Sequence, residues 1–551
     1  MCASSQPLAS QAGAQVLREG GTAADAAVAM AAVLAVTEPC STGIGGDALG
    51  LFLDGATGKV EALVGVGRAP QHLTRERLQA AGVSTLEPTS PFAVTVPGAP
   101  AAWCDAVERF GSGASAAARA RVLETAIRLA EGGAPISPVS AHHWRRAEAV
   151  LRSSPGGHAL LVDGERAPRV GEVFRNPDLA RTLRLVAQHG VDGFYRGPVA
   201  AAICERLAAV PMLPTDLEAH TSEVVRPLWA DYRGKRVYEV PSPAHGLAVL
   251  IALRVLEGVD LHAAAGEPHN NAAYLDVLIR AMRIGFAVAA MHVADHTARP
   301  DACTVCGGVT CAEVCYLLSD AYIDDCRKRM LAGQTLDDPG GGHTAPETIG
   351  GRDTVQFCAV DVHGNACSFI NSTCLGFGSG IVPNGCGFSL QNRGLGFSLD
   401  PSSPNCIGPG KRPYHTLIPA LATHADTGQL YAAFGVMGGM MQPQGHLQVV
   451  LNMLEWDMDP QETLDAPRFC IESGAFHAVH MATANVALEE GISDATADAL
   501  AAAGHVIHRR QVRGHHRAIF GRGQVIRRDP DSGVLWGGSD PRADGCAIPV
   551  L

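Results

Sequence analysis

The stretch DTVQFCAVDVHGNACSFINS, residues 353–372, decides the fold. Two alternating runs, Val355 to Val360 and Ala366 to Ile370, flank the turn sequence His-Gly-Asn and predict a β-hairpin. The preceding residues 335–352, TLDDPGGGHTAPETIGGR, predict a flexible linker, because they are rich in Gly and Pro and hold few apolar side chains. Thr354 is therefore expected where a flexible linker enters the first strand of a hairpin.

This position suits a particular kind of nucleophile. A Thr hydroxyl is weak without a base, but cutting the peptide bond before it frees an α-amine that can take the hydroxyl proton. Such a residue must begin a strand and follow a flexible loop, and Thr354 after Asp353 meets both conditions. Gly438-Gly439 follow the strand-like run Leu430 to Gly435 and can point backbone N–H groups at a developing oxyanion. Each signal taken alone also fits an ordinary strand start or tight turn.

The rest of the chain mixes helical and strand patterns. Residues 6–36 predict two helices around a break at Gly20-Gly21, followed by a Gly-rich loop and two short strands at 48–53 and 60–66. The loop Gly43 to Asp47 follows a helix and precedes a strand, which is the reverse of a dinucleotide-binding loop. We interpret it as a structural turn that lines the pocket, with Asp47 as a candidate supporting residue. Further helices are predicted at 119–129, 271–293, 446–456 and 495–503.

Composition narrows the class of protein. The chain has 551 residues, of which 47% are apolar and 18% charged, so it can bury a large core. A net charge of −12 and the lack of a long basic run argue against a nucleic-acid partner. The 16 Cys are scattered, which favours free thiols in a reducing compartment. No targeting segment or membrane-spanning run is visible, so we expect a cytoplasmic protein without a membrane partner.

The sequence resembles the γ-glutamyltranspeptidase family from end to end, in long blocks that keep their order and spacing. The resemblance implies a four-layer αββα sandwich of the N-terminal-nucleophile hydrolase type. It also implies a large subunit, residues 1–353, and a small subunit, residues 354–551, cut from one precursor between Asp353 and Thr354. The stretches QNRG and MQPQGH resemble the oxamate amidohydrolase-like branch. The blocks are SQPLASQAG and VLREGGTAADAAVAMAAVLAVTEPCSTGIGGDA, then DTVQFCAVDVHGNACSFINS and GFGSGIVPNGCGFSLQN, then PGKRPYHTLIPA, GVMGGMMQPQGHLQVVLNMLEWDMDPQETLDAPRF and SDPRADG.

The resemblance also implies roles for single residues. Thr354 stands in the place of the processing residue and catalytic nucleophile, and Ser372 in that of a hydroxyl that hydrogen-bonds it. Gly438 and Gly439 match the glycines of the oxyanion hole. The expected substrate-binding residues are Arg68, Asn392, Arg393, His415 and Thr416.

Departures from the family pattern concern specificity. An acid that holds the α-ammonium of glutamate is missing near Gly396, and a cation, Arg393, is present instead. Cys374 lies near the place of an amide side chain and cannot make the same hydrogen bonds. These changes predict an anionic acyl group without an α-ammonium. The loop 399–408 is shorter than the family's lid, so we expect water to be favoured over an amino-acid acceptor.

The sequence therefore predicts an autoprocessed enzyme without a cofactor. It would cleave a γ-glutamyl or related acidic amide through an acyl-Thr intermediate. One alternative is an amidohydrolase for small dicarboxylic amides such as oxamate, and another is a catalytically silent paralogue that stays a single chain. Four cysteines are spaced C-x2-C-x4-C-x3-C, which matches no standard metal site, and we predict no metal there; they are Cys303, Cys306, Cys311 and Cys315.

Overall fold

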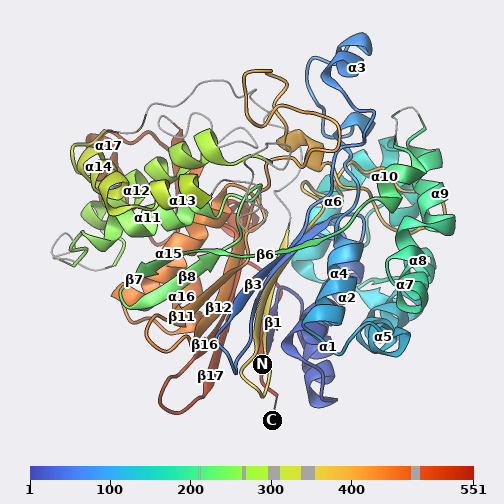
Figure 1. Ribbon diagram of the computed structural model, residues 1–551, viewed down its shortest axis with the longest axis horizontal. Coiled ribbons are helices and arrows are strands. Elements are labelled where there is room, and N and C mark those ends of the chain that lie inside the picture. Colours follow the sequence, from blue (N-terminus) through green and yellow to red (C-terminus); the bar gives the residue numbers. More distant parts are fainter. Residues whose placement is uncertain are drawn as a thin grey trace.

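Two β-sheets lie face to face at the centre of the molecule, and helices cover both outer faces (Figure 1). This computed structural model describes residues 1–208, 210, 212–262, 269–295, 311–334, 336, 354–472 and 484–550. The arrangement is the predicted αββα sandwich. The predicted linker at 335–352 lies outside the described residues except for Leu336, and so does Asp353.

The first sheet combines strands from the beginning, middle and end of the chain. Neighbouring strands are antiparallel throughout. The first and last strands pair with each other, so the two termini lie close together (Figure 1). In spatial order the strands are β18 (Cys546–Ile548), β1 (Cys2–Ser4), β9 (Val355–Val360), β10 (Ala366–Ser372), β2 (Asp47–Leu53), β3 (Val60–Gly65) and β6 (Glu223–Val225).

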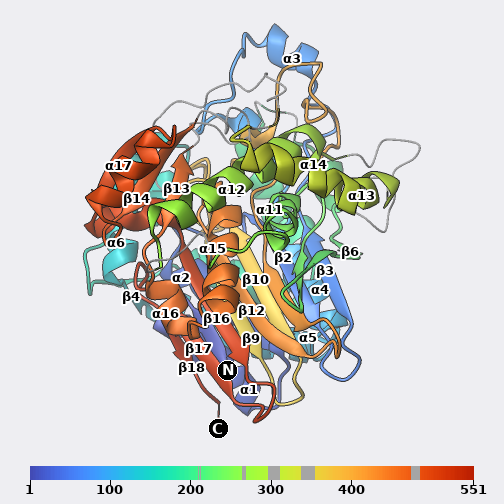
Figure 2. The same cartoon turned by 90° about the vertical axis from the view of Figure 1, so that its left-hand side faces the viewer.

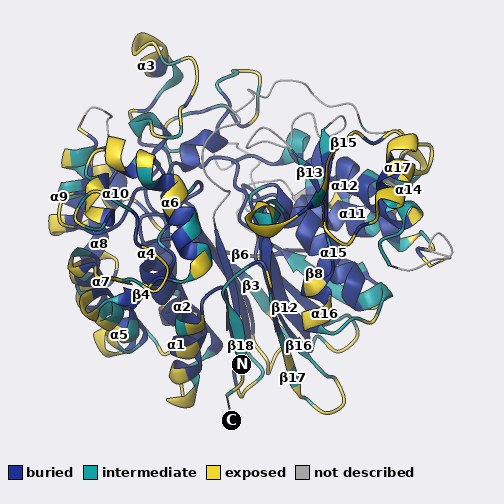
Figure 3. Ribbon diagram, turned by 180° about the vertical axis from the view of Figure 1, so that it is seen from behind, coloured by how far each residue is buried: buried dark blue, intermediate teal, exposed yellow. Residues whose placement is uncertain are grey.

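The second sheet packs its inner face against the first. Its strands are also antiparallel. In order they are β17 (Leu535–Ser539), β16 (Arg522–Arg528), β12 (Leu430–Met437), β11 (Ala420–His424), β8 (Lys235–Glu239) and β7 (Leu228–Tyr232). Most residues of the central strands are buried, as the dark ribbons at the centre of Figure 3 show. Small side chains allow this approach: a Cβ on Gly435 of β12 would lie 2.8 Å from Cγ of Gln356 on β9.

Helices flank the two sheets on opposite sides, as Figures 1 and 2 show. Helix α2 is buried along its whole length, and its Ala-rich sequence lets it pack between the first sheet and α5. The helices beside the first sheet are α1 (Pro7–Arg18), α2 (Ala23–Thr37), α4 (Ala99–Arg109), α5 (Ala116–Gly132), α6 (Pro138–Ser153), α7 (Pro177–His189), α8 (Asp192–Tyr195), α9 (Gly197–Arg206) and α10 (Pro214–Glu218). Those beside the second are α11 (Leu247–Glu257), α12 (Ala272–His292), α13 (Cys311–Leu317), α14 (Asp320–Leu331), α15 (Met441–Glu455), α16 (Pro460–Asp465) and α17 (Asp494–Ala502).

The remaining elements are short. A three-stranded sheet contains β13 (Phe469–Glu472), β14 (Asn485–Glu489) and β15 (Ile507–Val512), and a two-stranded one contains β4 (Ala134–Pro135) and β5 (Val173–Phe174). A further helix, α3, spans Arg75–Ala80.

The predicted hairpin, the two N-terminal helices and the helices near 119–129, 271–293 and 495–503 are confirmed. One prediction was wrong: the helix expected from His446 begins at Met441. Pro443 lies in the first turn of this helix, where a Pro removes no helical hydrogen bond.

The structure also shows the state of the cysteines and bears on metal binding and membrane insertion. The cysteines whose side chains the structure describes form no disulfides, and Cys358 is buried between the sheets. Cys315 is exposed on α13, whereas Cys303, Cys306 and the Cys311 side chain lie outside the described residues. Within the described part of the chain, no group of three or more His, Cys, Asp or Glu could hold a metal ion, and no helix is long and apolar enough to cross a membrane.

Candidate active site

The hairpin register brings Thr354 and Ser372 together. Val355, the first residue of β9, pairs with Asn371 of β10, so the residues one step further out lie side by side. The Thr354 hydroxyl is 3.1 Å from Ser372 Oγ, within hydrogen-bonding distance. Only 3% of Thr354 is exposed to solvent. A strand start therefore places a hydroxyl inside the protein, next to a second hydroxyl.

The Ser372 oxygen is a meeting point of several donors. Arg393 Nη2 donates to it at 3.2 Å, and the backbone N–H of Cys374 donates at 2.8 Å. Cys374 adopts φ +85°, a left-handed conformation that is uncommon for a residue other than Gly. This turn folds its N–H back onto Ser372. Arg393 Nη1 in turn donates to Thr416 Oγ1 at 3.0 Å. A continuous chain of contacts thus runs from Thr354 through Ser372 and Arg393 to Thr416.

Arg393 is a buried cation with no anion beside it in the described part of the chain. It is 2% exposed and forms no ion pair with a described carboxylate, and its Nε has no hydrogen-bond partner among the described residues. A side chain at position 396 would require a shift of the backbone, because a Cβ on Gly396 would lie 2.4 Å from the carbonyl oxygen of Tyr414. Burying a charge is unfavourable unless a partner offsets it. The site therefore favours a ligand that brings a negative charge.

His415 has both ring nitrogens occupied. Its Nε2 lies 3.0 Å from Asp47 Oδ2, and its Nδ1 accepts from the N–H of Leu417 at 3.2 Å. Burial and the nearby Arg393 lower the pKa of His415 to about 4, although Asp47 opposes the shift. The ring is therefore neutral at pH 7 and carries its proton on Nε2. In this state it has no donor left for a substrate.

Asn392 is likewise committed to the surrounding protein. Its amide nitrogen donates to the carbonyl oxygens of Pro88 and Gly378, both at 2.9 Å. Its amide oxygen accepts from the N–H of Leu375 at 3.3 Å. These bonds tie the loops that contain Pro88, Leu375 and Gly378 to the segment that carries Arg393.

Gly438 and Gly439 lie at the same end of the sandwich as Thr354. Ser368, which pairs with Cys358 of β9, donates to the carbonyl oxygen of Phe434, and Gly435 packs on Gln356. The start of β9, directly after Thr354, therefore lies beside the end of β12, where Gly438 and Gly439 follow. The two glycines have φ +134° and +61°, a region that L side chains rarely adopt. Among the described residues, neither of their N–H groups donates a hydrogen bond, which leaves both groups available to an oxyanion.

Arg68 belongs to a different cluster. Its guanidinium donates to Glu223 at 2.9 Å, to Asp295 at 3.4 Å and to the carbonyl oxygen of Gly410 at 3.1 Å. Arg412 pairs with the same two carboxylates. No described contact joins Arg68 to Thr354 or to Ser372. The structure thus gathers Thr354, Ser372, Arg393 and Thr416, and places Arg68 in an ion-pair cluster of its own.

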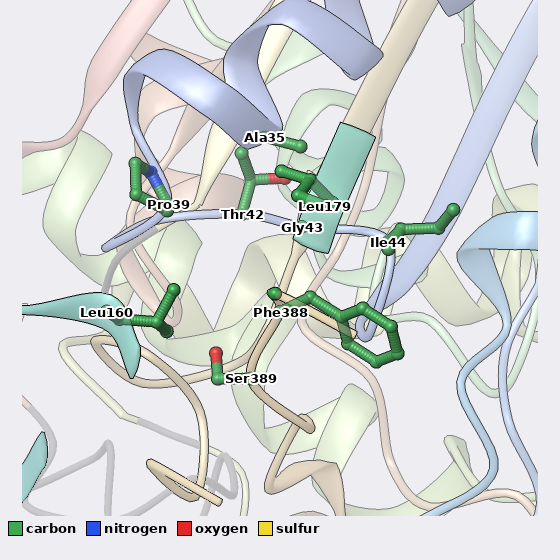
Figure 4. Close-up of a pocket in the computed structure, with 10 residues that line it drawn as sticks. Ala35, Pro39, Thr42, Gly43, Ile44, Leu160, Leu179, Phe388 and Ser389 are labelled. Atoms are coloured by element: carbon green, nitrogen blue, oxygen red, sulfur yellow. The ribbon is translucent and has the colours of Figure 1, made fainter. Parts of the chain in front are cut away.

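A small cavity lies behind the Gly-rich loop that precedes β2 (Figure 4). Six of its lining residues are apolar, and the polar atoms come from Thr42 and Ser389. Thr42 Oγ1 is buried without a hydrogen-bond partner in the described part of the chain. None of the candidate site residues lines the cavity, so it is separate from the site around Thr354. The apolar residues are Ala35, Pro39, Ile44, Leu160, Leu179 and Phe388.

The geometry can be compared with known proteins. A family model described as Gamma-glutamyltranspeptidase matches residues 9–550. The chain belongs to the γ-glutamyltranspeptidase family. It is 32% identical to the glutathione hydrolase-like YwrD proenzyme of Bacillus subtilis over 100% of this chain and 98% of that protein. It is 34% identical to the oxamate amidohydrolase proenzyme of Klebsiella pneumoniae over 98% of this chain and 96% of that protein.

Solved structures agree with this family assignment. The crystal structure of cephalosporin acylase from Bacillus halodurans aligns with a TM-score of 0.84 and 38% identity, over 99% of this chain and 94% of that chain. The predicted membership of the γ-glutamyltranspeptidase family, its sandwich fold and its enzymatic nature are therefore confirmed.

Proposed function

We propose that the chain cuts itself between Asp353 and Thr354 and then acts as an amidohydrolase on acyl groups that carry a carboxylate. The observation that carries this proposal is the buried guanidinium of Arg393, which contacts Ser372 beside the nucleophile and has no described carboxylate partner. The relatives named as proenzymes support the self-cleavage.

The fold would keep the two fragments together after the cut. Strands β9 and β10, which follow Thr354, lie between β1 and β2, which precede it. The second sheet likewise combines β7 and β8 with strands from the later part of the chain. Hydrogen bonds of both sheets therefore join residues 1–353 to residues 354–551, and the two parts would form one catalytic unit.

The attack begins with the α-amine that cleavage would free on Thr354. This amine takes the hydroxyl proton, and Thr354 Oγ1 then attacks the amide carbonyl. The Ser372 oxygen has two lone pairs, for which Arg393 and the Cys374 N–H compete with the Thr354 proton. Ser372 therefore orients the nucleophile without holding its proton firmly.

The oxyanion of the tetrahedral intermediate would be stabilised by the N–H groups of Gly438 and Gly439, which lie at the same end of the sandwich. When this intermediate collapses, the C–N bond breaks and the leaving amine takes the proton held by the Thr354 α-amine. Water, deprotonated by the same α-amine, then attacks the acyl-Thr ester, which releases the carboxylic acid and returns the proton to Thr354 Oγ1. We expect hydrolysis to exceed transfer to an amino-acid acceptor.

Arg393 and Thr416 would bind the carboxylate of the acyl group. Guanidinium groups hold carboxylates through paired, charge-assisted hydrogen bonds. Arg393 is only two hydrogen bonds away from Thr354 Oγ1, through Ser372. A carboxylate bound there lies near the reacting carbonyl, which suits short dicarboxylic acyl groups as well as the γ-glutamyl group. His415 and Asn392 would shape the pocket, and Arg68 would hold its outer loops.

The test starts with the intact mass of the denatured protein beside a Thr354→Ala variant. We expect two fragments that meet between Asp353 and Thr354, and a single chain in the variant. The processed protein is then assayed with oxalyl, succinyl, glutaryl and γ-glutamyl p-nitroanilides, with butyryl p-nitroanilide as the neutral control. Faster turnover of the acidic anilides supports the proposal. An uncut wild-type chain, or equal rates with the neutral anilide, contradicts it, and strong stimulation by glycylglycine would favour a transferase.

A further inference from the structure

Asp47 is a wholly buried carboxylate that joins four segments around the site. It is the first residue of β2 and pairs with Ser372 across the sheet. Its Oδ1 accepts from the N–H of Gly67 at 2.9 Å, from the N–H of Gly98 at 3.0 Å and from Gln391 Nε2 at 2.9 Å. All of these groups can only donate in these contacts. One oxygen thus holds two loops and the segment that leads into Arg393.

The other carboxylate oxygen, Oδ2, lies 3.0 Å from His415 Nε2. Leu417 N–H occupies the Nδ1 acceptor of His415, so the ring has to donate from Nε2 to the carboxylate. His415 directly precedes Thr416, whose hydroxyl accepts from Arg393. Asp47 is therefore connected to Arg393 by two routes. One runs along the chain from Gln391, and the other runs through His415 and its neighbour Thr416.

We infer that Asp47 is a positioning residue that aims Arg393 at the substrate carboxylate, an inference that rests on the proposed function. Asp47 fixes the tautomer and orientation of His415, and through Thr416 and Gln391 it fixes the guanidinium. It does not touch the substrate. Its loss would change the preference for acidic over neutral acyl groups before it changed the attack by Thr354.

An Asp47→Asn variant removes this function with almost no change in shape. The new NH2 group would face either three N–H donors or the Nε2–H of His415. His415 could accept from the new NH2 group only if its own proton moved to Nδ1. That proton would then face the N–H of Leu417, so two donors would oppose each other. His415→Phe interrupts the same connection from the other side and keeps a ring in place. The control is Asp54→Asn. Asp54 is exposed at the other end of β2, in the turn before β3, where its carboxylate accepts from the N–H groups of Ala56 and Thr57.

The experiment measures kcat/KM for succinyl and butyryl p-nitroanilide in the processed proteins, per active site. We expect the ratio of the two values to fall about tenfold in Asp47→Asn and in His415→Phe, mainly through KM of the succinyl compound. Asp54→Asn should keep the wild-type ratio. A merely structural role would lower the number of active sites and leave both the ratio and KM unchanged, and that result overturns the inference.

A second readout needs only the wild-type protein. Nitrogen-15 NMR of the His415 ring should show a neutral imidazole protonated on Nε2 from pH 5 to pH 8. A proton on Nδ1, or a doubly protonated ring at pH 7, overturns the inference even if both variants fail to fold. Failure of the proposed function is recognised separately, because the wild type would then stay uncut, hydrolyse neither anilide, or hydrolyse both anilides at equal rates.

Discussion

Two arginines, Arg393 and Arg412, are buried to the same degree, each 2% exposed, yet their surroundings differ completely. Arg412 contacts Asp295 at 3.2 Å and Glu223 at 3.0 Å, and burial, which lowers the pKa of Arg412, is outweighed by these carboxylates, so the pKa is raised. Among the described residues, the guanidinium of Arg393 hydrogen-bonds only to hydroxyl groups, those of Ser372 and Thr416.

The contrast distinguishes Arg412, whose ion pairs stabilise the fold, from Arg393, which has no described ion-pair partner. The surroundings of Arg412 already compensate its charge, so it ties loops together. Under the proposed function, the carboxylate of the acyl group compensates the charge of Arg393 when it binds beside Thr354. The four predictions below test this difference.

The largest effect is expected on stability in an Arg412→Met variant. Removing this side chain takes the guanidinium away from buried Asp295, whose ion pair with Arg68 is longer at 3.4 Å, so the free energy of unfolding should fall by about 3 to 5 kcal/mol. Urea denaturation measures it. Arg181→Met is the matched control, because its ion pair with Asp178 is exposed and should contribute less than about 1 kcal/mol. Equal stability of the two variants would remove the contrast.

An Arg393→Met variant should show the reverse pattern. We expect kcat/KM for the acidic anilides to fall about 10- to 100-fold, because a charged hydrogen-bond donor is lost, while the value for the butyryl anilide changes little. The free energy of unfolding should not fall by more than about 1 kcal/mol, since the removed charge has no described ion-pair partner. A large loss of stability with unchanged selectivity would make Arg393 a structural residue like Arg412.

The surroundings of Arg393 should also make the protein sensitive to acid. Burial is the main reason why the pKa of His415 is lowered to about 4 and that of His245 to about 3. Since the unfolded chain binds these protons near pH 6.5, the stabilisation is complete above that pH and is lost as the pH falls toward 4. Each histidine contributes up to about 1.4 kcal/mol per pH unit. Urea midpoints between pH 7 and pH 5 should fall in the wild type, and more gently in His415→Gln. A flat profile contradicts this.

The smallest effect is expected for Arg68→Gln. Arg68 has a third of its side chain exposed, and Arg412 still compensates the two carboxylates in its absence. We expect a stability change below about 1 kcal/mol and a KM for succinyl p-nitroanilide within about twofold of the wild type. A rise in KM of tenfold or more would instead make Arg68 the carboxylate ligand that the resemblance implied, and would place the substrate differently.

Local patterns predicted the hairpin that follows Thr354 and several of the helices. Alternation over residues 355–360 and 366–370 predicted the hairpin, because a strand with one face toward each neighbouring layer needs this period. Helix α15 begins five residues before the predicted start, and Pro443 lies within its first turn. Gln442 and His446 in this helix are buried and hydrogen-bonded, which a hydropathy pattern cannot show.

The site was predicted in part. Its hydroxyls and glycines follow recognisable stretches, and Arg393 stood out as a cation in place of an acid. The role of Asp47 was only suspected, although its position directly after Gly45-Gly46 was a usable signal. Those glycines allow the loop to approach the backbone closely, since a Cβ on Gly46 would lie 2.2 Å from the Ser372 carbonyl oxygen.

The sequence by itself determined the family, the hairpin that follows Thr354 and the residue types available for the chemistry, because these depend on neighbours along the chain. Only the tertiary structure decided which arginine has carboxylate partners. Asp295 and Glu223 are far from Arg412 in sequence, and the fold brings them together there and not at Arg393. Compensation of a buried charge depends on distances of a few ångströms between remote residues, and the order of residues along the chain does not contain those distances.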